Sequence, residues 1–237
     1  MRKYLQLLIV FILFSCSPVR KYQRLPEVLS WEKSILEFEQ LDKSEHHPDS
    51  AILFTGSSSI RLWSTLEKDM FPFPVIHRGY GGAKLSDFTI YADRIIEPHP
   101  CRAIVIFIAN DITGSDKDKS PQEVAELYRC LIKTIRKTHH DTPVFWIEIT
   151  PTSSRWKVWP EITKANNLIK DICNKQKNCY FITTGFAFLN DEGKPKDELF
   201  RPDKLHLNEE GYKVWSEIIK REISKVLVKN SHSTEIQ

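Results

Sequence analysis

Five short apolar segments alternate with segments of helical periodicity, and this alternation constrains the fold more than any other feature of the chain. Between the apolar segments, hydrophobic residues recur every three or four positions, as in helices that pack on a sheet. Residues 103–108, Ala-Ile-Val-Ile-Phe-Ile, show no polar alternation, which is typical of a central parallel strand buried on both faces. The pattern predicts a three-layer α/β/α sandwich around a five-stranded parallel sheet in flavodoxin-like order. The expected strands are 51–55, 75–77, 103–108, 143–149 and 180–182.

Length and composition indicate one ordinary globular domain. The chain has 237 residues, of which 41% are hydrophobic, enough for a single α/β core. The formal net charge of +3 gives no basic surface of the kind that binds nucleic acid, so no nucleic-acid partner is expected. We assign residues 17–26 to a polar tether, 27–228 to the domain and 229–237 to a polar tail.

The first residues have the features of a targeting segment. Arg2 and Lys3 precede an apolar run over residues 4–14, which is short for a membrane span but suits the core of a signal peptide. Leu13-Phe-Ser-Cys16 resembles the lipobox of bacterial lipoproteins. The resemblance implies a signal peptide over residues 1–16, lipidation at Cys16, and a lipid-anchored or secreted protein of the bacterial cell envelope. A buried N-terminal helix or an uncleaved anchor is the alternative.

The remaining cysteines do not indicate a metal site. Cys101, Cys130, Cys173 and Cys179 form no CxxC pair and no zinc-ligand spacing with histidine. The spacing leaves open a disulfide between Cys173 and Cys179 in an oxidising compartment. Buried free thiols are the favoured interpretation, because Cys101 and Cys130 lie on apolar segments.

Reactive residue types follow several of the expected strands. Gly56-Ser-Ser-Ser59 follows the first strand, Arg78-Gly-Tyr-Gly-Gly82 the second, and Asn110-Asp111 the third. Carboxyl ends of parallel strands meet at one edge of a sheet, where open α/β folds bind their ligands. A serine there needs a base to take its proton. Asp203-Lys-Leu-His206, just before the last helix, offers an imidazole and a carboxylate.

Taken together, these segments resemble the blocks of the SGNH hydrolase family, also called GDSL-type esterases and lipases. Gly56-Ser-Ser-Ser59 is similar to the first block of a bacterial branch, and Gly82 matches the glycine of the second block. Asn110-Asp111 matches the third block and Asp203-Lys-Leu-His206 the fifth. The order and spacing of the blocks fit over residues 51–226.

The resemblance implies a role for each matched residue. Ser58 would be the nucleophile, His206 the base, and Asp203 the residue that orients the imidazole. The backbone N–H groups of Ser58 and Gly82 and the side-chain amide of Asn110 would form the oxyanion hole. Glycine lets a backbone N–H approach a substrate oxygen freely, and an amide donates a hydrogen bond without titrating.

Three further positions bear on the pocket. Ile108 occupies the position of the usual glycine of the third block, so it is expected to shift the Asn110 donor or to narrow the pocket. Arg155 and Trp156 follow the fourth strand and are candidates for substrate binding.

The leading functional hypothesis is a serine esterase that removes short acyl groups, above all acetyl, from carbohydrate or other small esters. The resemblance implies neither a metal nor an organic cofactor. A lysophospholipase- or thioesterase-like acylhydrolase is an alternative, as is an inactive or glycan-binding envelope lipoprotein of the same fold. A nucleotide-binding protein is a further alternative, because the glycine-rich turn at residues 79–82 follows a strand.

Overall fold

The computed structural model describes the backbone of residues 18–234 and the side chains of residues 18–228. The predicted signal peptide at 1–16 and the lipidation site at Cys16 lie outside the described residues. Within residues 18–234, no helix is long and apolar enough to cross a membrane.

A five-stranded parallel sheet in the order β2-β1-β3-β4-β5 forms the centre of the molecule, which confirms the predicted fold class. The central strands β1 and β3 are buried along their whole length, as their continuous apolar sequence requires. The strands are β1 (Ile52–Gly56), β2 (Val75–Gly79), β3 (Ala103–Phe107), β4 (Val144–Ile147) and β5 (Cys179–Ile182).

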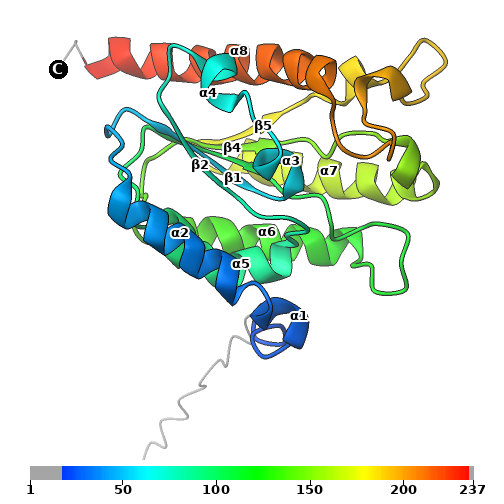
Figure 1. Cartoon of the computed structure of the whole chain (residues 1–237), viewed down its shortest axis with the longest axis horizontal. Coiled ribbons are helices and arrows are strands. Elements are labelled where there is room, and N and C mark those ends of the chain that lie inside the picture. Colours follow the sequence, from blue (N-terminus) through cyan, green and yellow to red (C-terminus); the bar gives the residue numbers. More distant parts are fainter. Residues whose placement is uncertain (1–17, 235–237) are drawn as a thin grey trace, which may run out of the picture.

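Helices cover both faces of the sheet and complete the three layers (Figure 1). One layer holds α2, α5, α6 and α7, which contact one another in sequence, and the other holds α4 and α8. The helices of the first layer are α2 (Glu32–Ser44), α5 (Leu85–Ile96), α6 (Pro121–Ile135) and α7 (Trp159–Lys175). The remaining α-helices are α1 (Pro26–Leu29), α3 (Ser58–Arg61), α4 (Leu66–Met70) and α8 (Glu209–Thr234). The 3-10 turns are η1 (Ser153–Val158), η2 (Gly185–Phe188) and η3 (Asp197–Leu199).

The N-terminal segment differs from the expected tether. Residues 18–25 form turns that pack on the domain, with Val19 buried and the Tyr22 hydroxyl hydrogen-bonded to Glu123 of α6. The Val19 side chain and the Tyr22 ring pack against the hydrophobic core. This apolar contact holds the segment on the domain, which a purely polar tether could not do. The segment then forms α1, which ends at Leu29, where the Ser30 hydroxyl donates to the Glu27 carbonyl, and α2 begins at Glu32.

The last helix also exceeds its expected end. α8 continues to Thr234, so its backbone extends into the segment 229–237 that was assigned to a polar tail. α6 begins at Pro121, and the Ser120 hydroxyl caps it by accepting the Glu123 N–H at 3.2 Å.

Candidate active site

The turn after β1 places Ser58 at the carboxyl edge of the sheet. Gly56 ends the strand at φ +126°, and a Cβ there would lie 2.1 Å from the Phe107 carbonyl oxygen of the neighbouring β3. Only glycine fits this close approach. The next N–H, that of Ser57, donates to the same carbonyl at 2.8 Å. The chain then turns away from the sheet, and Ser58 begins the four-residue helix α3.

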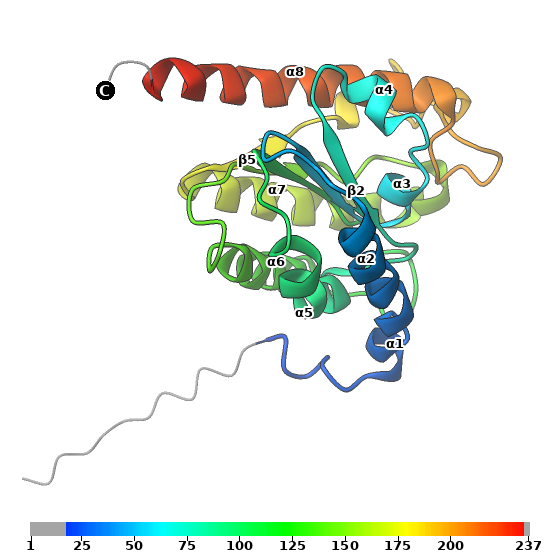
Figure 2. The same cartoon turned by 60° about the vertical axis from the view of Figure 1, so that its left-hand side comes forward.

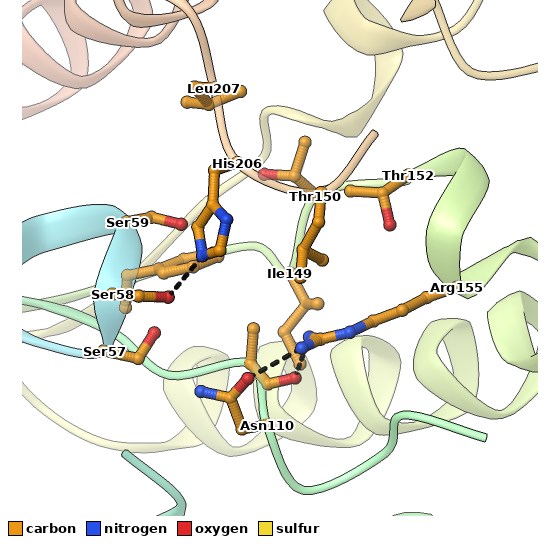
Figure 3. A pocket seen from close by; sticks show the side chains of 13 residues that line it. Ser57, Ser58, Ser59, Asn110, Ile149, Thr150, Thr152, Arg155, His206 and Leu207 are labelled. Carbon is orange, nitrogen blue, oxygen red and sulfur yellow. Dashed lines mark hydrogen bonds between the residues drawn. The ribbon is translucent and has the colours of Figure 1, made fainter. Parts of the chain in front are cut away.

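A chain of hydrogen bonds joins Ser58 to residues almost 150 positions later. The Ser58 Oγ lies 3.0 Å from Nε2 of His206, and Nδ1 of the same ring lies 2.7 Å from an Asp203 carboxylate oxygen. Figure 3 shows the His206 ring turned toward Ser58. These contacts give a hydroxyl, an imidazole and a carboxylate in the order that a catalytic triad requires.

Asp203 is held as an anion. Burial opposes its ionisation, but hydrogen bonds from the His206 ring and from the backbone N–H groups of His206 and Leu205 outweigh that effect and lower the pKa of Asp203 to about 2. The carboxylate therefore stays charged at neutral pH. A fixed anion at Nδ1 keeps the proton on that nitrogen, which leaves Nε2 free to accept the proton of Ser58.

Asn110 follows β3 and faces the same edge of the sheet. Its Nδ2 donates to the Ala83 carbonyl at 3.0 Å, which uses one of the two amide hydrogens. Its Oδ1 accepts a hydrogen bond from the Arg155 guanidinium at 2.7 Å, and the same guanidinium also donates to the Ala109 carbonyl (Figure 3). Since a guanidinium cannot accept, Arg155 decides which end of the Asn110 amide is the oxygen.

Arg155 is held by hydrogen bonds to two neutral oxygens, the Ala109 carbonyl and the Asn110 Oδ1. Burial lowers the pKa of its guanidinium, and the more distant charges of Asp118 and Asp111 oppose that shift. Its two hydrogen bonds to oxygens beside the pocket fix the loop of η1 against the end of β3.

The loop after β2 approaches the site from the other side. Gly82 has φ +77° and is exposed, and the next residue supplies the carbonyl that Asn110 binds. The Asp111 carboxylate accepts the Leu85 N–H at 2.8 Å and so caps the start of α5, which precedes it in the chain. The loop is thus tied to the end of β3 at two points.

The pocket in front of Ser58 is small. Its cavity volume is about 20 Å³, which is room for a small group or about one water molecule. The Thr150 and Thr152 hydroxyls are buried and have no hydrogen-bond partner among the residues that the structure describes. The lining residues are Ser57, Ser58, Ser59, Phe107, Ala109, Asn110, Ile149, Thr150, Thr152, Arg155, Leu205, His206 and Leu207.

The structure brings some of the predicted residues together and separates others. Ser58, Asn110, Arg155 and His206 line one pocket, with Asp203 directly behind the imidazole. Gly82 instead lines a neighbouring cavity.

Two side chains that were expected to affect the pocket, Ile108 and Trp156, do not line it. Ile108 is buried and does not line the pocket, so its side chain does not narrow the space in front of Ser58. Trp156 also lies outside the pocket lining. Its ring stacks on Trp159 at 6.0 Å between ring centroids, and Lys194 lies over its face.

Sequence reasoning missed Thr150 and Thr152. Both follow the carboxyl end of β4, the same position in the fold that drew attention to the serines and to Asn110. Their place after a strand could therefore have indicated them. Threonine is so common in loops, however, that this place alone does not indicate a site.

Within residues 18–228, no group of three or more histidine, cysteine or acidic side chains is arranged to hold a metal ion. Cys101, Cys130, Cys173 and Cys179 are free thiols. The Cys173 thiol lies 3.1 Å from the Tyr128 hydroxyl, so the disulfide with Cys179 that the spacing left open is not formed.

The sequence profile of the GDSL-like Lipase/Acylhydrolase family matches residues 44–214. None of the curated proteins compared with the chain matches it.

Solved structures with the same fold include a protein from Streptococcus pneumonia named for platelet activating factor. It has a TM-score of 0.73 and 19% identity, over 83% of this chain and 94% of that one. A GDSL-like lipase from Bacteroides thetaiotaomicron has a TM-score of 0.64 and 15% identity, over 81% of this chain and 98% of that one. A carbohydrate esterase family 3 protein from Talaromyces cellulolyticus has a TM-score of 0.60 and 13% identity, over 76% of this chain and 99% of that one. At such identities the likeness concerns the fold alone.

Proposed function

Because the chain belongs to the GDSL-like lipase/acylhydrolase family and is therefore an ester hydrolase, we propose that it is a serine esterase with Ser58, His206 and Asp203 as its catalytic triad. The observation that carries this proposal is the unbroken hydrogen-bond chain from Asp203 through His206 to Ser58, with distances of 2.7 and 3.0 Å.

In the first half of the reaction, the Ser58 Oγ forms a bond to the ester carbonyl carbon while its proton passes to Nε2 of His206. The carbonyl oxygen becomes negative and accepts hydrogen bonds from the Ser58 N–H and the second amide hydrogen of Asn110. The Gly82 N–H, which the family resemblance adds as a third donor, belongs to a residue that does not line this pocket. When this intermediate collapses, the bond to the alcohol oxygen breaks and the alcohol leaves with the proton of His206. The acyl group remains on Ser58.

In the second half, His206 takes a proton from water, and the resulting hydroxide attacks the acyl carbon. The intermediate uses the same hydrogen-bond donors. Its collapse releases the carboxylic acid and returns the proton to Ser58. Throughout, the low pKa of Asp203 keeps a negative charge beside the imidazolium and lowers its energy.

We further propose that the acyl group is short, with acetyl as the favoured substrate group. A cavity of about 20 Å³ suits a methyl group and gives no room for a long acyl chain, which a lysophospholipase or a long-chain thioesterase would require. The fold is shared with a carbohydrate esterase family 3 protein, which is consistent with acetylated carbohydrate as the substrate.

Labelling with a fluorophosphonate tests the catalytic proposal. The wild-type protein is expected to be modified at Ser58, and Ser58→Ala is expected to lose both labelling and hydrolysis of 4-nitrophenyl acetate. Ser64→Ala, which changes a serine outside the pocket lining, is the matched control and should behave as wild type. Retained turnover in Ser58→Ala would remove Ser58 from the mechanism, and an unlabelled, inactive wild type would favour the inactive lipoprotein.

A series of 4-nitrophenyl esters tests the acyl length. We expect kcat/KM to fall at least about tenfold from acetate to octanoate, since each methylene beyond the cavity has to displace packed side chains. Equal or better hydrolysis of octanoate would instead favour the lysophospholipase- or thioesterase-like alternative.

We also propose that the protein resides in the bacterial cell envelope, attached through a lipid on Cys16. The support is the charged start, the apolar run and the lipobox-like Leu13-Phe-Ser-Cys16 of the sequence. Incorporation of labelled palmitate in a bacterial host, lost in Cys16→Ser, is the expected result. Labelling that persists in Cys16→Ser would contradict this attachment.

A further inference from the structure

A second cavity lies beside the candidate active site, between the N-terminal segment and the loop after β2. Its volume is about 320 Å³, and its lining includes Tyr22, Glu27, Trp31, Gly82 and Lys84. Figures 1 and 2 both show α1 and α2 on the α5 side of the sheet, and residues of α1, α5 and α6 line the cavity. The cavity is far larger than the pocket in front of Ser58.

One wall of this cavity comes from residues that precede the matched family region, which begins at residue 44. That wall is held in place by polar contacts, because the Lys21 ammonium and the Tyr22 hydroxyl both donate to the Glu123 carboxylate of α6. Lys119 lies over the Tyr22 ring, 5.2 Å from its centroid. The N-terminal segment is thus a fixed part of the cavity.

The cavity and the pocket of Ser58 share no lining residue, but a hydrogen bond connects a residue of the pocket to the loop that lines the cavity. Asn110 faces the pocket, Gly82 faces the cavity, and the hydrogen bond from Asn110 to the Ala83 carbonyl joins the two sides. Gly82 is exposed and has no side chain to block passage over it. The Trp31 ring lies directly beyond, since a Cβ placed on Gly82 would meet it at 3.4 Å. The segment Gly82–Ala83 thus contacts both Asn110 of the pocket and Trp31 of the cavity.

The charges around the cavity favour a neutral ligand. Three lysines and four acidic residues line it, so neither sign dominates. Several of these charged groups already have partners within the protein. Glu123 binds Lys21, and Lys119 pairs with Asp111 at 3.1 Å. Asp118 accepts hydrogen bonds from backbone N–H groups of the preceding turn. A phosphate or polyanion would need a surplus of positive charge.

The aromatic residues favour a ligand with a flat apolar face and polar edges. Trp31 and Tyr22 supply half-buried rings, while Glu27 and Lys84 supply an acceptor and a donor at the rim. A pyranose ring has this character, because its C–H faces pack on aromatic rings and its hydroxyls hydrogen-bond to carboxylates and ammonium groups.

We propose that this cavity binds a sugar ring of the carbohydrate that carries the ester, with Trp31 as the stacking platform. This inference rests on the proposed esterase function and names the part of the substrate that the pocket of Ser58 does not hold.

The test compares two acetyl esters that differ in the alcohol. For each variant, kcat/KM is measured for an acetylated xylo-oligosaccharide and for 4-nitrophenyl acetate, and the ratio of the two is taken. We expect Trp31→Ala to lower this ratio at least tenfold, mainly through KM of the oligosaccharide. If Trp31→Ala also disturbs the neighbouring Gly82, hydrolysis of both esters changes equally, and the ratio of the two kcat/KM values does not change. Phe71→Ala, which changes an aromatic ring that is 75% exposed next to α4, is the control and should leave the ratio within twofold of wild type.

A binding experiment separates recognition from catalysis. The Ser58→Ala protein is expected to show saturation-transfer NMR signals from the deacetylated xylo-oligosaccharide, and the Ser58→Ala/Trp31→Ala protein is expected to lose them. An equal loss on both esters in Trp31→Ala, or oligosaccharide binding that survives in the double variant, would overturn the proposal. So would a wild type that hydrolyses 4-nitrophenyl acetate but not the acetylated sugar. A wild type that is not labelled by fluorophosphonate and hydrolyses neither ester would instead count against the esterase function itself.

Discussion

At the scale of single residues, the environment of Asn110 decides what its amide can do. One amide hydrogen is used by the Ala83 carbonyl, and the oxygen is used by Arg155. The second hydrogen is left for a substrate oxygen. The hydrogen bond from a cationic donor also polarises the amide, which strengthens its N–H as a donor. The sequence made Arg155, which follows β4, a candidate for substrate binding. Its hydrogen bond to the Asn110 Oδ1 would also allow it to position Asn110.

Asn110→Ala is expected to lower kcat about 10²–10³-fold with a smaller change in KM, because an oxyanion donor acts mainly in the transition state. Steady-state kinetics with 4-nitrophenyl acetate give both constants. The exposed Asn174→Ala on α7 is the control and should leave them unchanged. A wild-type kcat in Asn110→Ala would contradict the proposed oxyanion hole.

Arg155→Met is expected to lower kcat about tenfold, in line with the loss of a charged hydrogen bond of about 1.5 kcal/mol. If Arg155 acts through Asn110, the same change adds little in the Asn110→Ala background, and a double-mutant cycle of kcat measures this coupling. Additive losses would show that Arg155 acts on the substrate directly, as a substrate-binding residue would.

At the scale of elements, the turn between β1 and α3 is the most constrained part of the site. Gly56 must pass within contact of the Phe107 carbonyl, with a backbone conformation that other residues rarely adopt. This close approach locks β1 to β3 at the point where Ser58 leaves the sheet. The position of the nucleophile is thus fixed by backbone contacts of the sheet, and not by its own short helix.

Gly56→Ala is expected to destabilise the protein by at least about 3 kcal/mol, because both the clash with the Phe107 carbonyl and the positive φ oppose a Cβ. Gly193→Ala provides the matched control: Gly193 also has a positive φ, of +70°, but a Cβ there meets no atom within 4 Å. Gly193→Ala is expected to lower the free energy of unfolding by about 1 kcal/mol. Urea denaturation measures the free energy of unfolding of both variants. Equal losses of stability would mean that the contact with Phe107 does not constrain the turn.

At the scale of the whole molecule, a buried acid couples stability to pH. Asp87 of α5 accepts hydrogen bonds from the Tyr80 hydroxyl and the Lys84 N–H. Burial raises the pKa of Asp87 to about 7, and the nearby charge of Asp111 adds to this effect, although the two hydrogen bonds oppose it. Asp87 lies under the loop that carries Gly82, so the same group affects both the fold and the site.

The contribution of Asp87 to the free energy of unfolding is expected to fall as pH rises from about 4 to about 7. In this window the native state holds a proton on Asp87 that the unfolded chain has lost, so unfolding releases a proton and rising pH favours it. A shift of about three pKa units corresponds to at most about 4 kcal/mol. Urea denaturation at pH 4.5 and 7.5 should show a smaller fall in Asp87→Asn than in wild type. Equal falls would mean that Asp87 is not the group responsible.

The chain by itself determined the elements and the residue types of the site. Continuous apolar runs such as 103–108 specify buried parallel strands, and parallel strands bring their carboxyl ends to one edge. The serines at 57–59 and Asn110 were therefore predictable from their places after strands, whereas the roles of Ser58, Asp203 and His206 came from the resemblance to the SGNH hydrolase blocks.

Only the tertiary structure decided how side chains with several possible partners are used. The Glu123 carboxylate accepts hydrogen bonds from Lys21 and Tyr22, about 100 positions earlier in the chain, and fixes the N-terminal segment to the domain. Asp111 caps a helix that begins 26 residues earlier, and Arg155 binds the end of β3. A long or charged side chain can form its hydrogen bonds with many different partners. Which partner it binds depends on which groups the folded chain places within its reach. That information is absent from any local stretch of sequence.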